Sequence, residues 1–186
     1  MKKISPPFLL FISTCFFSFV ISASAQELSS SEKNTWKTAL KTMERSDQLY
    51  RGKMIKQPEL NTDSIWKLQS AIDSSNKQQF VDLTKQLGYP SLKRVGNETS
   101  MGLILHFTLE NDFAELKDLF KVELDKGNMP PKHYAWWFDR CQRNMNKPIY
   151  FGQYTNEKFC GEQLKTFNQR RKEIGLEALE ANPDCK

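Results

Sequence analysis

The chain has 186 residues, of which 39% are hydrophobic and 26% are charged, and its formal net charge is +5. This balance excludes a disordered chain and a protein with several membrane spans, and the length fits one ordinary domain. The basic excess is small and contains no run of five or more like charges, so no nucleic-acid partner is expected.

Residues 1–25 are expected to form a secretory signal peptide rather than part of the fold. Two lysines follow Met1, a phenylalanine-rich apolar run covers 8–21, and Ala23-Ser24-Ala25 offers small residues for cleavage. The run is short for a membrane span of ~20 residues, although an uncleaved anchor is the alternative. We expect the mature chain, 26–186, in the periplasm or outside the cell, with no integral membrane segment.

The first half of the mature chain is predicted to be helical. A helix over 32–51 has apolar side chains at helical spacing along one stripe. Thr62 or Asp63 is expected to cap a second helix. Asn76 is expected to cap a third helix, which ends at Gly88 because proline follows soon after that glycine.

Three more helices are predicted in the middle of the chain. Apolar residues cover most of the circumference of 98–107, so this helix is expected to be buried on nearly all sides, with His106 near its end. Asp112 starts the capping signature of the next helix, and Pro130-Pro131 opens the one after it.

The pattern changes in the last part of the chain. Residues 149–155 are rich in β-formers and can turn back into 158–164, which predicts a hairpin. Thr166 and Gln169 resemble a capping box for a final helix. The expected fold class is therefore mainly α, a single-domain helical array with one late β-hairpin.

Three cysteines remain once the leader is removed, namely Cys141, Cys160 and Cys185. In an oxidising compartment one pair can form a disulfide, which leaves one thiol over. We expect the pair to be Cys141–Cys160. The chain has no Cys-x-x-Cys or His-x-x-x-His spacing, so neither a metal nor another cofactor is expected.

Residues 88–180 contain short motifs in a fixed order. In chain order they are Gly88-Tyr89-Pro90, Val95-Gly96, His106, Asp139-Arg140, Tyr150–Gln153 and Arg170-Arg171 before Gly175-Leu176. This order resembles an uncharacterised, mostly bacterial domain family of unknown function, with the pattern Gly-Trp-Pro, Val-Gly, Gln-His, Asp-Arg, Tyr-Gly-Thr-Gln and Arg-Arg before Gly-Leu. The chain differs from that pattern at Tyr89, at Leu105 and within 150–153. The resemblance implies no reaction, because none is assigned to the family.

Several of these residues are candidates for acid–base chemistry or ligand binding. The imidazole of His106 suits proton transfer near neutral pH, and a carboxylate such as Asp139 can orient it. The candidate ligand-binding residues are Arg140, Tyr150, Gln153, Arg170 and Arg171, whose side chains suit a carboxylate, a phosphate or a sugar. Trp136 can stack on a sugar ring.

Structural interpretations of the same residues are equally available. A histidine in an apolar helix is commonly a hydrogen-bonded core residue, which applies to His106. The adjacent residues Asp139 and Arg140 cannot face each other on one helix, so Asp139 can form a structural ion pair with Arg170 or Arg171 instead.

The leading hypothesis is an exported binding or interaction module with a pocket for a small polar or anionic ligand. The alternative is a small hydrolase or transferase acting on an anionic or sugar-like ligand. In that alternative His106 is the general acid/base, Asp139 orients it, and the arginines clamp the anion. A structural envelope protein is the third possibility.

Overall fold

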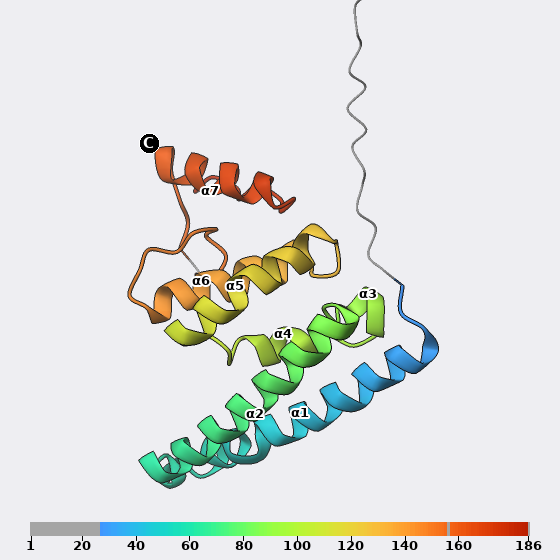
Figure 1. Cartoon of the computed structure of the whole chain (residues 1–186). Coiled ribbons are helices and arrows are strands. Elements are labelled where there is room, and N and C mark those ends of the chain that lie inside the picture. The colour runs from blue at the N-terminus through green and yellow to red at the C-terminus, as the bar shows by residue number, and fades with distance from the viewer. Residues whose placement is uncertain (1–26, 156, 186) are drawn as a thin grey trace, which may run out of the picture.

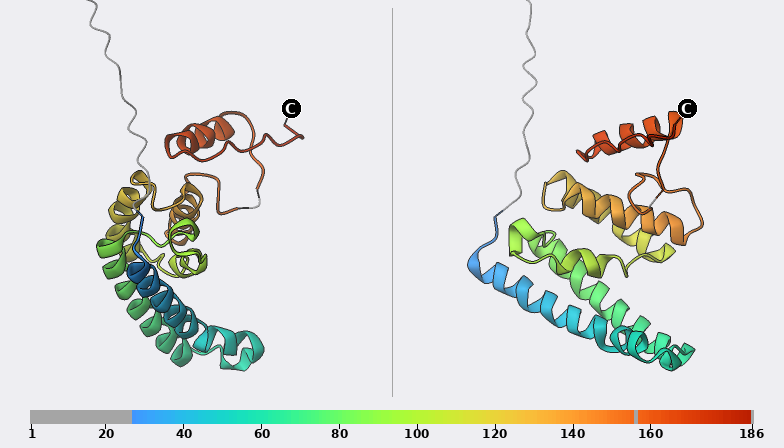
Figure 2. Two further views of the ribbon diagram at one scale, coloured as in Figure 1. Left: turned by 90° about the vertical axis from the view of Figure 1, so that its right-hand side faces the viewer. Right: turned by 180° about the vertical axis from the view of Figure 1, so that it is seen from behind.

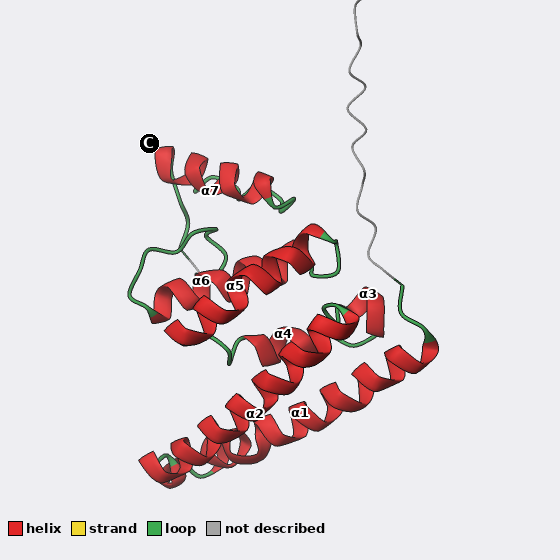
Figure 3. Ribbon diagram, in the orientation of Figure 1, coloured by secondary structure: helices red, strands yellow, loops and turns green. Residues whose placement is uncertain are grey.

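The computed structural model describes residues 27–155 and 157–185, so the predicted signal peptide over 1–25 lies outside the described residues. Within the described residues the chain forms seven α-helices, one short 3-10 helix and no strand (Figure 3). The predicted mainly α class is confirmed, and the predicted late β-hairpin is wrong. No helix in this part of the chain is long and apolar enough to cross a lipid bilayer.

The two longest helices form an antiparallel pair whose connected ends project beyond the rest of the molecule (Figure 1). They are α1 (Ser30–Lys56) and α2 (Asp63–Leu87), joined through the 3-10 helix η1 (Pro58–Leu60). A reciprocal capping box between Ser29 and Glu32 starts α1, and the Thr62 side chain caps α2 as predicted.

Asn76 does not cap a helix, which corrects the prediction of two separate helices here. It lies in the middle of α2, is buried, and faces α1. Its Nδ2 donates to the Met43 carbonyl at 3.2 Å, and its Oδ1 accepts from the Ser46 hydroxyl at 2.9 Å. The asparagine therefore pairs with the neighbouring helix, a contact that no local sequence pattern reveals.

The core lies between this pair and a second helix pair. The connecting helices α3 (Leu92–Val95) and α4 (Thr99–Ile104) lead to α5 (Glu110–Asp125) and α6 (Pro131–Asn144), and α4 lies between the two pairs (Figure 2). The largest fully buried side chains include Trp36, Leu40, Met43, Phe80, Tyr89, Ile104, Phe107, Leu116, Phe120 and Trp137. All helices from α1 to α6 therefore share one apolar core.

The predicted helix over 98–107 is shorter in the structure. Helix α4 ends at Ile104, and a turn carries the chain through His106 before α5 begins. Helix α5 begins at Glu110, so Asp112 lies inside its first turn and does not cap it with Glu115 as predicted. The Asp112 carboxylate instead accepts from the Leu109 amide at 3.0 Å. Helix α6 opens at Pro131, as expected.

A loop replaces the predicted hairpin and leads into the last helix, α7 (Gly161–Glu173). Gly152 in this loop has a φ of +65°, and a Cβ there would lie 2.9 Å from the Leu179 side chain and 3.1 Å from that of Phe167. Glycine is required because the backbone is left-handed and the C-terminal segment packs against it. Helix α7 starts well before Thr166, so the capping box predicted there is also wrong.

The disulfide joins Cys160 to Cys185, so the predicted Cys141–Cys160 pair is wrong. Cys141 faces the core from α6 as a buried free thiol, and burial raises its pKa to about 12. Cys160 lies at the exposed start of α7, where the C-terminal tail returns. The bond therefore closes the tail onto α7. Burial keeps the thiol of Cys141 protonated and unreactive near neutral pH.

Candidate functional site

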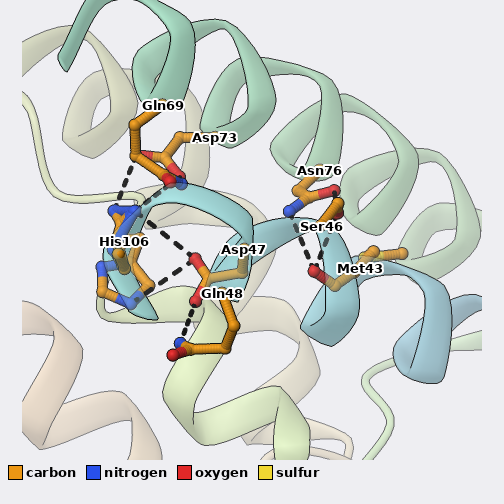
Figure 4. A network of polar contacts seen from close by, with 9 residues as sticks. Met43, Ser46, Asp47, Gln48, Gln69, Asp73, Asn76 and His106 are labelled. Atoms are coloured by element: carbon orange, nitrogen blue, oxygen red, sulfur yellow. Dashed lines mark hydrogen bonds and ion pairs between the residues drawn. The ribbon is translucent and has the colours of Figure 1, made fainter. Parts of the chain in front are cut away.

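His106 lies just after α4 and faces α1 rather than α6. Its Nε2 is 3.6 Å from Oδ1 of Asp47 (Figure 4). Burial lowers the pKa of His106, and the Asp47 carboxylate opposes this effect. Because the pKa is lowered, the imidazole is mainly neutral near pH 7.

Asp47 extends this contact into a polar network between α1 and α2. Arg51 lies 3.7 Å from Asp47 and bonds both oxygens of Asp73, at 3.2 and 2.8 Å. Gln69 also donates to Asp73, at 2.9 Å (Figure 4). Burial raises the pKa of Asp73, while Gln69 and Arg51 counteract that shift. The network pairs its charges internally and ties His106 to the first helix pair.

A small cavity of about 160 Å³ opens beside His106. Its lining includes the partly exposed Trp66 and the charged residues Lys77 and Asp112. Lys77 Nζ contacts carboxylate oxygens of Asp112 at 2.7 Å and Glu115 at 2.8 Å. In residues 27–155 and 157–185, no group of three or more metal-binding side chains is placed to hold a metal ion. A ligand that enters this cavity would therefore meet charged side chains that are already paired with one another.

Asp139 forms its hydrogen bonds with the loop after α6 and not with His106. It is fully buried, and its carboxylate accepts three backbone hydrogen bonds. The donors are the amides of Tyr150 at 2.7 Å, Phe151 at 2.8 Å and Gln153 at 2.7 Å. Within the described chain, no hydrogen bond or ion pair joins Asp139 to His106. The structure therefore does not form the predicted acid–base pair.

Arg170 and Arg171 hold the same loop through its carbonyl groups. Arg171 Nη1 donates to the Phe151 carbonyl at 3.1 Å and to Gln153 Oε1 at 3.0 Å. Arg170 donates to the Tyr150 carbonyl at 3.2 Å, and its guanidinium carbon lies 4.0 Å from the centre of the Tyr150 ring. These contacts make both arginines structural partners of the loop, and Arg171 is buried.

An open groove of about 800 Å³ runs between α6 and this loop. It is lined by Trp136, Arg143, Ile149, Gln153, Tyr154, Thr155 and Glu157. The rings of Trp136 and Tyr154 meet edge to face, with their centres 6.0 Å apart. Of the residues predicted to bind a ligand, Gln153 lines this groove and Arg140 lies beside it.

Two arginines of α6 extend over the Tyr154 ring. The guanidinium carbons of Arg140 and Arg143 lie 5.5 and 5.6 Å from its centre. Neither guanidinium has a carboxylate within 4.0 Å among the residues that the structure describes. Within the described chain, the groove is therefore flanked by two cations that form no ion pair, and Glu157 is the one acidic residue among its lining residues.

Neither Arg143 nor Tyr154 is among the residues predicted from the sequence to bind a ligand. Trp136, Arg140 and Arg143 follow the helical spacing of one face, so the spacing itself was a usable signal for Arg143. Tyr154 had no such signal, because the path of the loop decides where its ring lies.

No protein-family model, curated protein or solved structure matches this chain. The resemblance of residues 88–180 to a bacterial family of unknown function therefore stays a prediction.

Proposed function

We propose that the chain is a binding module whose groove between α6 and the 149–155 loop takes a small anionic ligand. The observation that carries this proposal is the pair Arg140 and Arg143, held 5.5 and 5.6 Å from one ring centre without a carboxylate partner in the described chain. Two neighbouring cations repel each other, and an anion between them relieves that repulsion and accepts charge-assisted hydrogen bonds.

The other groove residues favour an anion that has a ring. Trp136 and Tyr154 offer aromatic surface, on which the apolar face of a sugar ring can pack. Gln153 adds an amide that can bond hydroxyl or phosphate oxygens. A phosphorylated or carboxylated sugar is therefore the simplest ligand class that fits both features.

The geometry gives less support to the hydrolase or transferase alternative. Both oxygens of Asp139 are occupied by loop amides, and His106 contacts Asp47 in a separate polar network. Among the described lining residues of the groove, Glu157 is the single carboxylate, and no histidine or lysine stands beside a hydroxyl or thiol to activate it. Export to the periplasm or the exterior remains part of the proposal, and it is supported only by the composition of residues 1–25.

The direct test is a titration followed by two-dimensional proton–nitrogen NMR. The probes are glucose 6-phosphate, inorganic phosphate and glucose, which separate the contribution of charge from that of the ring. We expect glucose 6-phosphate to shift the Trp136 indole resonance most, inorganic phosphate to act more weakly, and glucose to have little effect. The indoles of Trp36 and Trp137 are internal controls because both are fully buried in the core.

Arg143→Gln should weaken binding of glucose 6-phosphate by about tenfold or more, since a hydrogen bond to a charged group contributes ~1.5–3 kcal/mol. Arg45→Gln is the matched control, because Arg45 is an exposed arginine on α1 away from the groove. Equal weakening by both substitutions would mean that binding follows net charge alone. No shift of Trp136 with either phosphate probe would reject the proposal.

A further inference from the structure

We infer that Gln153 determines the specificity of the proposed groove by presenting its amide Nε2 as a fixed donor to an oxygen of the ligand. This inference rests on the proposed anion-binding function and names the contact that would select an oxyanion. Gln153 is the groove residue whose backbone and side chain are both held by buried charged groups.

The first constraint acts on the backbone. The Gln153 amide donates to Asp139 at 2.7 Å, and Asp139 also binds the amides of Tyr150 and Phe151. Because Asp139 belongs to α6, the position of Gln153 is tied to the helix that carries Arg143. The two groove residues therefore have a fixed relation to each other.

The second constraint acts on the side chain and decides which atom remains for a ligand. Gln153 Oε1 lies 3.0 Å from Nη1 of Arg171. A guanidinium group has only donors, so the amide oxygen and not the amide nitrogen must face Arg171. The opposite orientation would place two donors against each other at a buried arginine.

Among the described residues, Gln153 Nε2 is then left without an acceptor at the groove. It makes no hydrogen bond to any residue that the structure describes. Arg143, which lines the same groove, also has donors only. Both groups call for acceptor atoms on the ligand, as a phosphate or a carboxylate provides. A ligand that places an ammonium or amide donor here would leave both of them unsatisfied.

Gln153→Glu tests this role while keeping the partner of Arg171. A carboxylate at this position still accepts from Arg171, so the melting temperature should be unchanged or raised. The substitution replaces the donor by an acceptor, and we expect binding of glucose 6-phosphate to weaken at least tenfold.

Thr155→Asp is the matched control for charge. It adds the same negative charge to a neighbouring lining residue but leaves the Gln153 donor in place. We expect this variant to weaken binding by less than threefold. In the unsubstituted protein, the side-chain amide resonances of Gln153 should also shift on addition of inorganic phosphate.

The outcomes separate the two proposals. Equal weakening by Gln153→Glu and Thr155→Asp, with an unmoved Gln153 side-chain amide, overturns the specificity role. The groove itself still stands in that case if Arg143→Gln abolishes binding. If neither phosphate probe binds the unsubstituted protein, the binding function fails and the role of Gln153 fails with it.

Discussion

Two regions of this molecule bury polar side chains for different purposes. Between α1 and α2, the cluster of Asp47, Arg51 and Asp73 joins helices whose own backbone hydrogen bonds are already made. Around the 149–155 loop, Asp139 and Arg171 instead bond backbone amides and carbonyls directly. The first cluster connects two complete helices. The second cluster supplies the backbone hydrogen bonds that a neighbouring strand would supply in a β-sheet.

This difference predicts where a polar substitution should lower the free energy of unfolding most. A buried backbone group without a partner costs free energy comparable to a lost hydrogen bond, whatever the side chain. Removal of Asp139 leaves three loop amides unpaired, whereas removal of Asn76 from the α1–α2 interface leaves one carbonyl and one hydroxyl to find other partners. The following experiments test that contrast.

The largest effect is expected for Asp139→Asn. The amide can still accept some of the three hydrogen bonds, but it loses the charge and presents a donor to buried donors. We expect a loss of about 3 kcal/mol in the free energy of unfolding, measured with urea. Asp118→Asn, at an exposed position of α5, should change it by less than about 0.5 kcal/mol. A loss below about 1 kcal/mol at Asp139 would remove the basis of the comparison.

The disulfide is expected to stabilise the second region by a comparable amount. Cys185→Ser opens a cross-link between residues separated by 25 positions, and the chain-entropy estimate for such a loop is about 3 kcal/mol. Thermal unfolding with and without a reductant measures the effect. Reductant should destabilise the unsubstituted protein and leave Cys185→Ser unchanged, because the thiol of Cys141 forms no bond. A further loss in the variant would contradict this pairing.

Acidification should lower the free energy of unfolding through the two histidines, His106 beside α1 and His133 on α6. The 149–155 loop contains no histidine. Burial and the neighbouring Lys132 lower the pKa of His133 to about 4, and its Nδ1 lies 2.9 Å from the Tyr89 hydroxyl. The unfolded histidine binds its proton first, near pH 6.5, so this stability is lost as the pH falls from about 6.5 to about 4.

The expected loss from His133 is about 1–2 kcal/mol after its partial exposure is allowed for. Urea unfolding of the unsubstituted protein and of His133→Gln at pH 7 and pH 4.5 measures it. His106, whose pKa burial also lowers, should contribute in the same direction. The prediction fails if His133→Gln shows the same pH dependence as the unsubstituted protein.

The smallest effect is expected for Asn76→Ala in the first region. It removes one hydrogen bond to the Met43 carbonyl and one from Ser46, in a helix that stays intact, so we expect a loss of about 1 kcal/mol. Ser75→Ala, at the neighbouring exposed position, is the control for helix propensity in urea unfolding. A loss as large as that of Asp139→Asn would erase the distinction between the regions.

The candidate site was foreseeable in part. Asp139, Tyr150, Gln153, Arg170 and Arg171 do gather around one loop, as their shared polar character suggested. Their roles were not foreseeable, because the side chains bond backbone groups whose positions depend on the path of the loop. His106 belongs to a different network, which forms only because the turn after α4 meets α1.

The mainly helical class, the apolar stripe of α1 and the proline start of α6 follow from the sequence, because helical periodicity and capping are local properties. The remaining features depend on tertiary contacts. A β-strand needs a second strand whose backbone accepts its hydrogen bonds. The backbone amides of the β-forming residues after α6 donate to the carboxylate of Asp139 instead. Asn76 forms hydrogen bonds with another helix instead of capping its own. Cys160 forms a disulfide with Cys185 in the C-terminal tail. Each of these outcomes depends on residues distant in sequence, and no local pattern specifies which distant residue arrives.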